Sequence, residues 1–145
     1  MVQLRYITPT FAVAGALQPE DFAELARLGF KGVISNRPDG EEWGQLTAAN
    51  SAELAETAGL AFRHVPAAKH DIFSPAVGSA MQAAMTAVGE PAVAHCKSGL
   101  RSALLWALVK AGDTPVDQII AAVREAGYDL SGLAEEIAAA GERRG

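Results

Sequence analysis

Short apolar segments alternate with amphipathic ones along the chain, and this alternation constrains the fold more than any other feature. The segments with strand-like composition are 5–8, 11–15, 31–36, 61–67 and 91–96. Helical patterns occupy 18–30, 47–60, 75–89 and 101–112, and apolar stripes at 116–123 and 130–137 indicate two more helices. Strands that alternate with helices typically form a parallel sheet covered on both faces. The pattern therefore predicts an α/β fold, a three-layer sandwich with a mainly parallel sheet of about four to five strands flanked by helices.

The length and charge of the chain narrow the range of its partners. The 145 residues suit one domain, and no repeat or low-complexity linker divides residues 1–145. A formal net charge of −5 disfavours binding to nucleic acid or to an anionic membrane through bulk electrostatics. No apolar run approaches the roughly 18 residues that span a bilayer, and the first residues lack the pattern of a signal peptide. We expect a single cytoplasmic domain.

The cysteine and histidine content argues against a metal site. Cys96 is the only cysteine, so the chain has neither a disulfide pair nor a set of thiolate ligands. The histidines, His64, His70 and His95, show no metal-ligand spacing. We expect no metal and no organic cofactor.

The single cysteine stands at the head of the stretch AHCKSGLRS, between a predicted strand and a predicted helix. In an α/β sheet, such a junction places the loop at the carboxyl end of a strand, where N–H groups at the start of a helix attract anions. Arg101 adds a planar charge that pairs with two oxygens, and a thiol in that field is expected to react as a thiolate. The predicted nucleophile is Cys96, and the predicted anion-binding residues around it are Lys97, Ser98, Gly99, Leu100, Arg101 and Ser102.

A second cation is predicted from the neighbouring strand. Arg37 follows the strand at 31–36 and should reach the end of the sheet at which Cys96 lies, where it would hold an oxyanion of the substrate. A turn-stabilising salt bridge with Glu41 or Glu42 explains Arg37 equally well.

Two aspartates are candidates for a general acid. Asp71, in AAKHDIFSP, is the better placed along the chain, although a helix-capping or solvated loop position accounts for it more readily. Asp39, in RPDGEE, is the second candidate, and its alternative is a turn residue before Gly40. His95 precedes the nucleophile, and the sequence leaves open whether its side chain faces the thiol or the core.

These residues carry a resemblance to two cysteine-dependent families. The pattern HC followed by a glycine-containing loop and RS resembles the signature of tyrosine and dual-specificity phosphatases, Cys-x5-Arg-Ser/Thr. Here only four residues separate Cys96 from Arg101. That shorter spacing is similar to the active-site loop of rhodaneses, which carry a persulfide on their cysteine.

A resemblance that covers nearly the whole chain is to a small bacterial phosphatase-like family whose members carry both phosphatase and sulfurtransferase labels. It rests on the blocks FAVAGALQPEDFAELARLGFKGVISNRPDGEE, AGLAFRHVPA, HCKSGLRSALLWAL and AGYDL. The family also occurs fused to metallo-β-lactamase-like persulfide dioxygenases, which implies a functional link to such enzymes. The resemblance implies a phosphatase-like fold with the cysteine loop as the active site. Family members often have Tyr at the position of His95, whereas His is usual in phosphatases.

Sulfur transfer is the function that we predict first. A loop shortened by one residue suits a single sulfur atom better than a phosphoryl group. Cys96 would take a sulfane sulfur from thiosulfate or glutathione persulfide and pass it to a thiol or cyanide. The partners would then be a small anionic sulfur donor and a thiol acceptor, for a chain that is a monomer or a homodimer. Two alternatives stay open: a cysteine-dependent phosphatase with Asp71 as acid, and a non-catalytic module that senses oxidants or binds anions.

Overall fold

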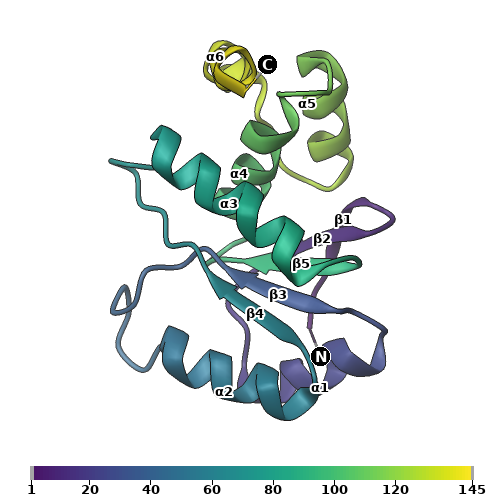
Figure 1. The fold of residues 1–145 in the computed structure, drawn as a ribbon, viewed down its shortest axis with the longest axis vertical. Coiled ribbons are helices and arrows are strands. Elements are labelled where there is room, and N and C mark those ends of the chain that lie inside the picture. Colours follow the sequence, from purple (N-terminus) through teal and green to yellow (C-terminus); the bar gives the residue numbers. More distant parts are fainter. Residues whose placement is uncertain (1, 145) are drawn as a thin grey trace.

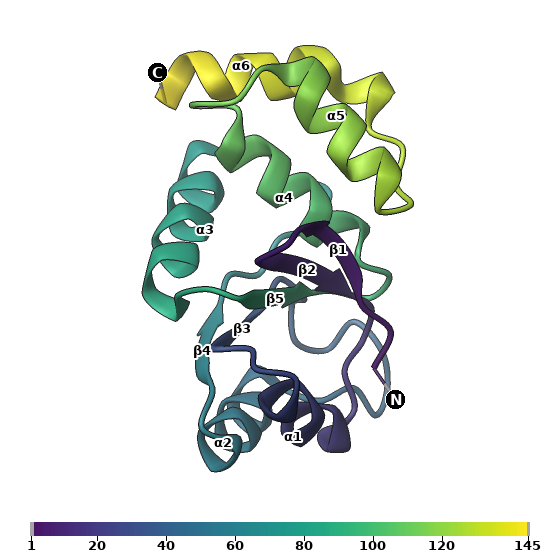
Figure 2. The same cartoon turned by 90° about the vertical axis from the view of Figure 1, so that its right-hand side faces the viewer.

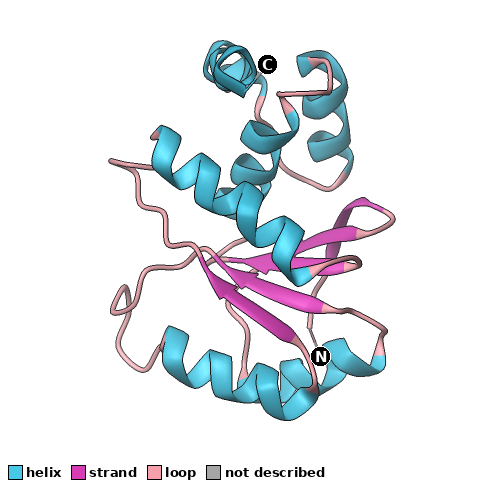
Figure 3. Cartoon of the chain, viewed as in Figure 1, coloured by secondary structure: helices cyan, strands magenta, loops and turns pink. Residues whose placement is uncertain are grey.

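The computed structural model describes residues 2–144, and within them a five-stranded sheet carries helices on both faces (Figures 1 and 3). The strands are β1 (Arg5–Thr8), β2 (Phe11–Ala14), β3 (Gly32–Ser35), β4 (Ala61–His64) and β5 (Ala92–His95). The helices are α1 (Pro19–Arg27), α2 (Ala48–Ala58), α3 (Pro75–Val88), α4 (Leu100–Lys110), α5 (Val116–Glu125) and α6 (Ala134–Arg144), with a 3-10 turn, η1, at Ser131–Leu133. The predicted fold class is confirmed.

The sheet has the strand order β1-β2-β5-β3-β4. The strands β2, β5, β3 and β4 run parallel, and only β1 pairs in the antiparallel direction, at the edge. All residues of β2, β3 and β5 are buried, which explains why these strands consist mainly of small and apolar residues, with polar side chains only at Ser35 and His95 at the ends of β3 and β5. The central strand of the sheet, β5, ends immediately before Cys96, and the parallel strand β3 lies next to it.

Two apolar cores form, one on each face of the sheet. The larger core lies under α3 and α4, with α5 and α6 packed outside α4 as an additional layer (Figure 2). The smaller core lies between the sheet and the helices α1 and α2. Successive residues of β5 serve the two cores in turn: Ala92 and Ala94 belong to the larger core, and Val93 belongs to the smaller. The side chains of β5 therefore point alternately to the two faces of the sheet.

The helices begin and end at local signals that the sequence contains. Thr47 caps α2 by accepting a hydrogen bond from the Asn50 N–H, and Gly59 ends the helix in the left-handed conformation. Ser74 caps α3 in the same way, with Pro75 in its first turn. None of the helices in residues 2–144 is long and apolar enough to cross a membrane.

Candidate active site

The thiol of Cys96 lies in the loop that joins β5 to α4. Cys96 is buried, with 1% of its surface exposed, and its N–H donates a hydrogen bond of 3.3 Å to the carbonyl of Ala14 on β2. The N–H of Gly99 points back to the sulfur, with a nitrogen–sulfur distance of 3.1 Å. The loop backbone therefore turns an N–H group toward the sulfur, as expected of an anion-binding loop.

Two neighbouring segments hold the loop in this shape. The Ala16 N–H donates to the Lys97 carbonyl at 3.2 Å, and the Tyr128 hydroxyl donates to the Ser98 carbonyl at 3.0 Å. Gly99 has a φ of +94°, and a Cβ atom there would collide with the Tyr128 hydroxyl. Glycine is thus required at this position for both its backbone conformation and the approach of Tyr128.

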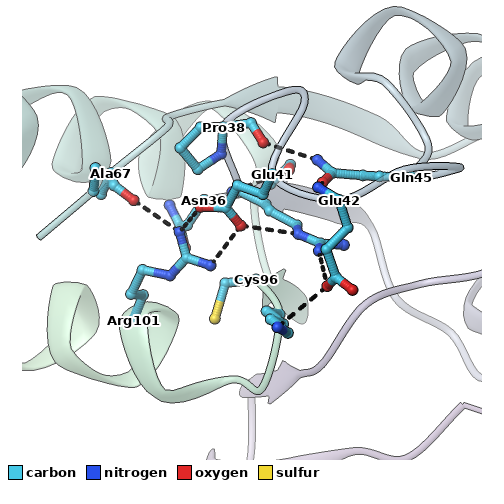
Figure 4. A network of polar contacts seen from close by, with 12 residues as sticks. Asn36, Pro38, Glu41, Glu42, Gln45, Ala67, Cys96 and Arg101 are labelled. Carbon is cyan, nitrogen blue, oxygen red and sulfur yellow. Dashed lines mark hydrogen bonds and ion pairs between the residues drawn. The ribbon is translucent and has the colours of Figure 1, made fainter.

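The guanidinium of Arg101 projects from the first turn of α4 and has fixed partners (Figure 4). Its Nη1 donates to the Ala67 carbonyl at 3.0 Å and to Oε2 of Glu41 at 2.7 Å, and its Nη2 donates to Oε1 of Glu41 at 2.9 Å. The hydrogen bond with Glu41, and to a lesser extent the interaction with Cys96, raises the pKa of Arg101. The cation is therefore permanent and held beside the cysteine.

Arg37 and Arg101 converge on the same carboxylate. Oε1 of Glu41 also accepts from Nε of Arg37 at 3.0 Å. The hydrogen bond from Arg101 and the one from Arg37 lower the pKa of Glu41, although partial burial opposes them. Glu42 accepts from Nη2 of Arg37 at 2.6 Å and lies 3.4 Å from Nζ of Lys97. Three cations and two carboxylates thus meet above the cysteine loop.

Arg37 itself is buried and anchored at the end of β3. Its N–H lies 3.4 Å from the Ser35 hydroxyl, and its carbonyl lies 2.9 Å from Nε2 of His64. The structure therefore brings the predicted second cation to the same site as Arg101, and it also contains both of the salt bridges that were considered as the alternative.

The hydroxyl groups of the loop have other partners than the thiol. Ser102 is fully buried and donates to Oδ1 of Asn36 at 2.8 Å, while Nδ2 of Asn36 donates to the Val65 carbonyl at 3.0 Å. This chain of bonds joins the start of α4 to the ends of β3 and β4. Ser98 is exposed, and its hydroxyl oxygen lies 3.4 Å from the Leu100 N–H.

The two predicted acids serve as acceptors for backbone N–H groups. Oδ1 of Asp71 accepts from Ala68 at 2.8 Å, closing the turn before α3. Oδ1 of Asp39 accepts from Ala48 at 2.8 Å, at the first turn of α2. Asp71 thus closes a turn and does not cap a helix, whereas Asp39, considered as a turn residue before Gly40, binds the first turn of α2. An acid role for either stays a prediction.

His95 lies on the side of the sheet that α1 and α2 cover. Two residues after Val93 on β5, it lines a cavity of about 20 Å³ together with Ser35, Arg37 and Gln45. Neither ring nitrogen has a well-formed hydrogen bond within the described residues. Burial lowers the pKa of His95 from 6.5 to about 4, and a weak backbone contact with Cys96 offsets this only in part. The ring is therefore neutral at pH 7.

Three contributors to the site were not predicted as such. Glu41 was considered only as a partner of Arg37, and Asn36 and Tyr128 were given no role. Their one sequence signal is that all three lie in blocks that carry the family resemblance, NRPDGEE and AGYDL. Elsewhere, Trp43 is fully exposed on the loop after β3. In the described part of the chain no three His, Cys, Asp or Glu side chains are grouped to hold a metal ion.

Comparisons with known proteins agree on one family. The family model described as "Beta-lactamase hydrolase-like protein, phosphatase-like domain" matches residues 3–113. A beta-lactamase hydrolase-like protein of Xylella fastidiosa (strain Temecula1) is 35% identical over 128 residues, which are 86% of this chain and 29% of that protein. The chain thus spans less than a third of the length of this curated relative.

Solved structures show the same fold. A crystal structure of a Neisseria meningitidis Z2491 protein, described as a "putative phosphatase", superposes with a TM-score of 0.80 at 31% identity and covers 93% of this chain and 96% of that one. A crystal structure of kinase associated phosphatase superposes with a TM-score of 0.74 at 17% identity, and the match covers 99% of this chain and 95% of that one. At that identity the second match establishes only the fold.

Proposed function

The chain belongs to the family of phosphatase-like domains of beta-lactamase hydrolase-like proteins, and from that premise we propose that it is a cysteine-dependent phosphatase. The observation that carries the proposal is the position of the Cys96 sulfur, 3.1 Å from the Gly99 N–H at the start of α4, with Arg101 in the first turn of that helix. A nucleophile, N–H donors and a fixed cation are what transfer of a phosphoryl group requires.

The reaction would take place in two steps. The Cys96 thiolate attacks phosphorus, the bond from phosphorus to the leaving oxygen breaks, and a phosphocysteine forms. Water then attacks phosphorus, the phosphorus–sulfur bond breaks, and inorganic phosphate leaves as the thiolate is restored. In both steps the N–H groups at the start of α4 and the Arg101 guanidinium take up charge on the phosphoryl oxygens.

The carboxylates near the site indicate which phosphoesters would react. Glu41 is paired with two arginines that lower its pKa, so it holds no proton at pH 7, and Asp71 accepts a backbone hydrogen bond. A leaving group that departs without being protonated suits such a site. We therefore assign aryl phosphates, of which phosphotyrosine is an example, as the substrate class.

Sulfur transfer is the second candidate, and one observation favours it. Only four residues separate Cys96 from Arg101, and the Gly99 N–H already contacts the sulfur, so the ring around the thiol is narrow. In this reaction the thiolate attacks the sulfane sulfur of thiosulfate, the sulfur–sulfur bond breaks, and sulfite leaves. A thiol or cyanide then takes the outer sulfur from the Cys96 persulfide. A redox-sensing module, in contrast, would react once and stop.

Turnover of both substrate classes by one preparation tests the proposal. Aryl-phosphate hydrolysis and thiocyanate formation from thiosulfate and cyanide are measured with the native chain and with Cys96→Ser. The proposal predicts hydrolysis that disappears in the Cys96→Ser variant. Thiocyanate formation that depends on Cys96, with no hydrolysis, would replace it with the second candidate. A single reaction of the thiol without turnover would replace both with the sensing module.

A further inference from the structure

We propose that Glu41 sets the affinity of this site for oxyanions, because its carboxylate occupies the place at Arg101 that the oxygens of a phosphoryl group need. The inference rests on the proposed function and adds to it: the substrate competes with a residue of the chain itself for Arg101.

The contacts of Glu41 reproduce those expected of a bound oxyanion. Both of its carboxylate oxygens accept from Arg101, at 2.7 and 2.9 Å, and one of them also accepts from Arg37 at 3.0 Å. Two parallel N–H bonds from one guanidinium are the usual way in which arginine binds phosphate. Figure 4 shows the Glu41 carboxylate bound to Arg101, and Arg101 also interacts with Cys96, so this ion pair belongs to the site of the nucleophile.

The donors of Arg101 are largely used by these contacts. Nη1 gives its hydrogen bonds to Glu41 and to the Ala67 carbonyl, and Nη2 gives one to Glu41. Arg101 also interacts with Cys96, which contributes to its raised pKa. The contacts with Glu41 and Ala67 use three of the five N–H groups of Arg101. A phosphoryl group therefore binds Nη1 and Nη2 together only when the Glu41 carboxylate withdraws, and at the remaining N–H groups it faces the negative charge of Glu41.

Withdrawal of Glu41 does not disturb either apolar core. Glu41 lies on the segment between β3 and α2, which is held by polar contacts such as the one from Nε2 of Gln45 to the Pro38 carbonyl at 2.8 Å. The side chain of Glu41 is 27% exposed, and Trp43 on the same segment packs against nothing. The cost of exchange is thus the loss of ion pairs, which a substrate oxyanion replaces.

Glu42 provides a matched control. It carries the same charge on the next residue and pairs with Arg37 and Lys97, but Arg101 is held by Glu41. Removing either charge changes the net charge of the chain equally, so a difference between the two variants reports on the position of Glu41 at Arg101.

The test is calorimetric binding of inorganic phosphate to the native chain, Glu41→Gln, Glu41→Asp and Glu42→Gln, with thermal unfolding as a check on folding. Because a partly exposed, charge-assisted pair is lost, Glu41→Gln should bind phosphate about tenfold more tightly. Glu42→Gln should change the affinity less than about threefold, and Glu41→Asp should stay nearer to the native chain. For aryl phosphate, KM should fall in Glu41→Gln with a smaller change in kcat.

Two results would overturn the inference: equal or weaker phosphate binding by Glu41→Gln, or equal tightening by Glu41→Gln and Glu42→Gln. Because phosphate binding requires no turnover, it is measured separately from the hydrolysis that tests the proposed function. Tighter binding without hydrolysis would refute the phosphatase while the role of Glu41 stands, and hydrolysis without tighter binding would do the reverse.

Discussion

Glu41 and Arg101, sixty residues apart in the chain, form a two-point ion pair in which each carboxylate oxygen faces one terminal nitrogen, at 2.7 and 2.9 Å. The pair joins the loop after β3 to the helix after β5. It exists because β3 and β5 are adjacent parallel strands, whose carboxyl ends lie at one edge of the sheet. The site is therefore assembled by topology, and its charges are balanced within the chain.

Replacing Arg101 with lysine tests the need for a planar, two-point cation. Lysine keeps the charge but loses the paired N–H donors, so kcat/KM for aryl-phosphate hydrolysis should fall about a hundredfold. Arg63→Lys, at an exposed position on β4, is the control and should keep the native rate. Native activity in Arg101→Lys would show that charge alone is sufficient.

Replacing Gly99 with alanine tests the shape of the loop. The residue has a φ of +94° and faces the Tyr128 hydroxyl, so the variant should lower the free energy of unfolding by about 1–3 kcal/mol and reduce hydrolysis. Urea unfolding measures the first effect. Gly132→Ala, at a position with open space, should be nearly neutral. Removing the opposing hydroxyl in Gly99→Ala/Tyr128→Phe should recover part of the loss, and no recovery would show that the contact with Tyr128 is unimportant.

The buried His95 predicts a loss of stability in acid. Its pKa is about 4 when folded and 6.5 as the ordinary value, so the unfolded chain binds the proton first as pH falls. The free energy of unfolding is therefore unaffected by His95 above pH 6.5 and falls as the pH drops below it. The loss levels off near pH 4, where it reaches about 3 kcal/mol. Urea unfolding between pH 7 and pH 4.5 should show this slope, and His95→Gln should lack it. An equal slope in both proteins would assign the effect to other groups.

Replacing Asp71 with asparagine distinguishes a general acid from a residue that only stabilises the turn before α3. The side-chain oxygen of asparagine still accepts from the Ala68 N–H, so the turn before α3 is preserved. We expect hydrolysis of an unactivated aryl phosphate such as phosphotyrosine to stay within about threefold of the native rate, because Asp71 serves the turn and the proposed reaction uses no proton from it. A loss of about a hundredfold would identify Asp71 as the general acid.

The sequence was sufficient for the strands, the helices and the local part of the site. Apolar runs bounded by turn residues predicted the strands, and Cys96 and Arg101 lie close because one short loop connects them. Arg37 was placed at the same edge because it follows a parallel strand. These inferences need only local patterns and the rule that parallel strands end together.

The remaining features depend on packing that no local pattern contains. The orientation of His95 follows from the alternation along β5, which is settled only when the two cores form. Tyr128 reaches Ser98 because α5 packs on α4, and Glu41 contacts both arginines because its loop folds back over the site. Each of these requires the relative placement of segments far apart in the chain.

The covalent state of Cys96 during the reaction is the most direct test of the phosphatase assignment. The native chain is mixed with an aryl phosphate, quenched in acid at early times, and weighed by intact-protein mass spectrometry, with Cys96→Ser as control. The account predicts a transient species heavier by one phosphoryl group, located on Cys96 and absent from the control. Aryl phosphate that is not consumed and leaves no adduct, while thiosulfate adds one sulfur atom to Cys96, would contradict it.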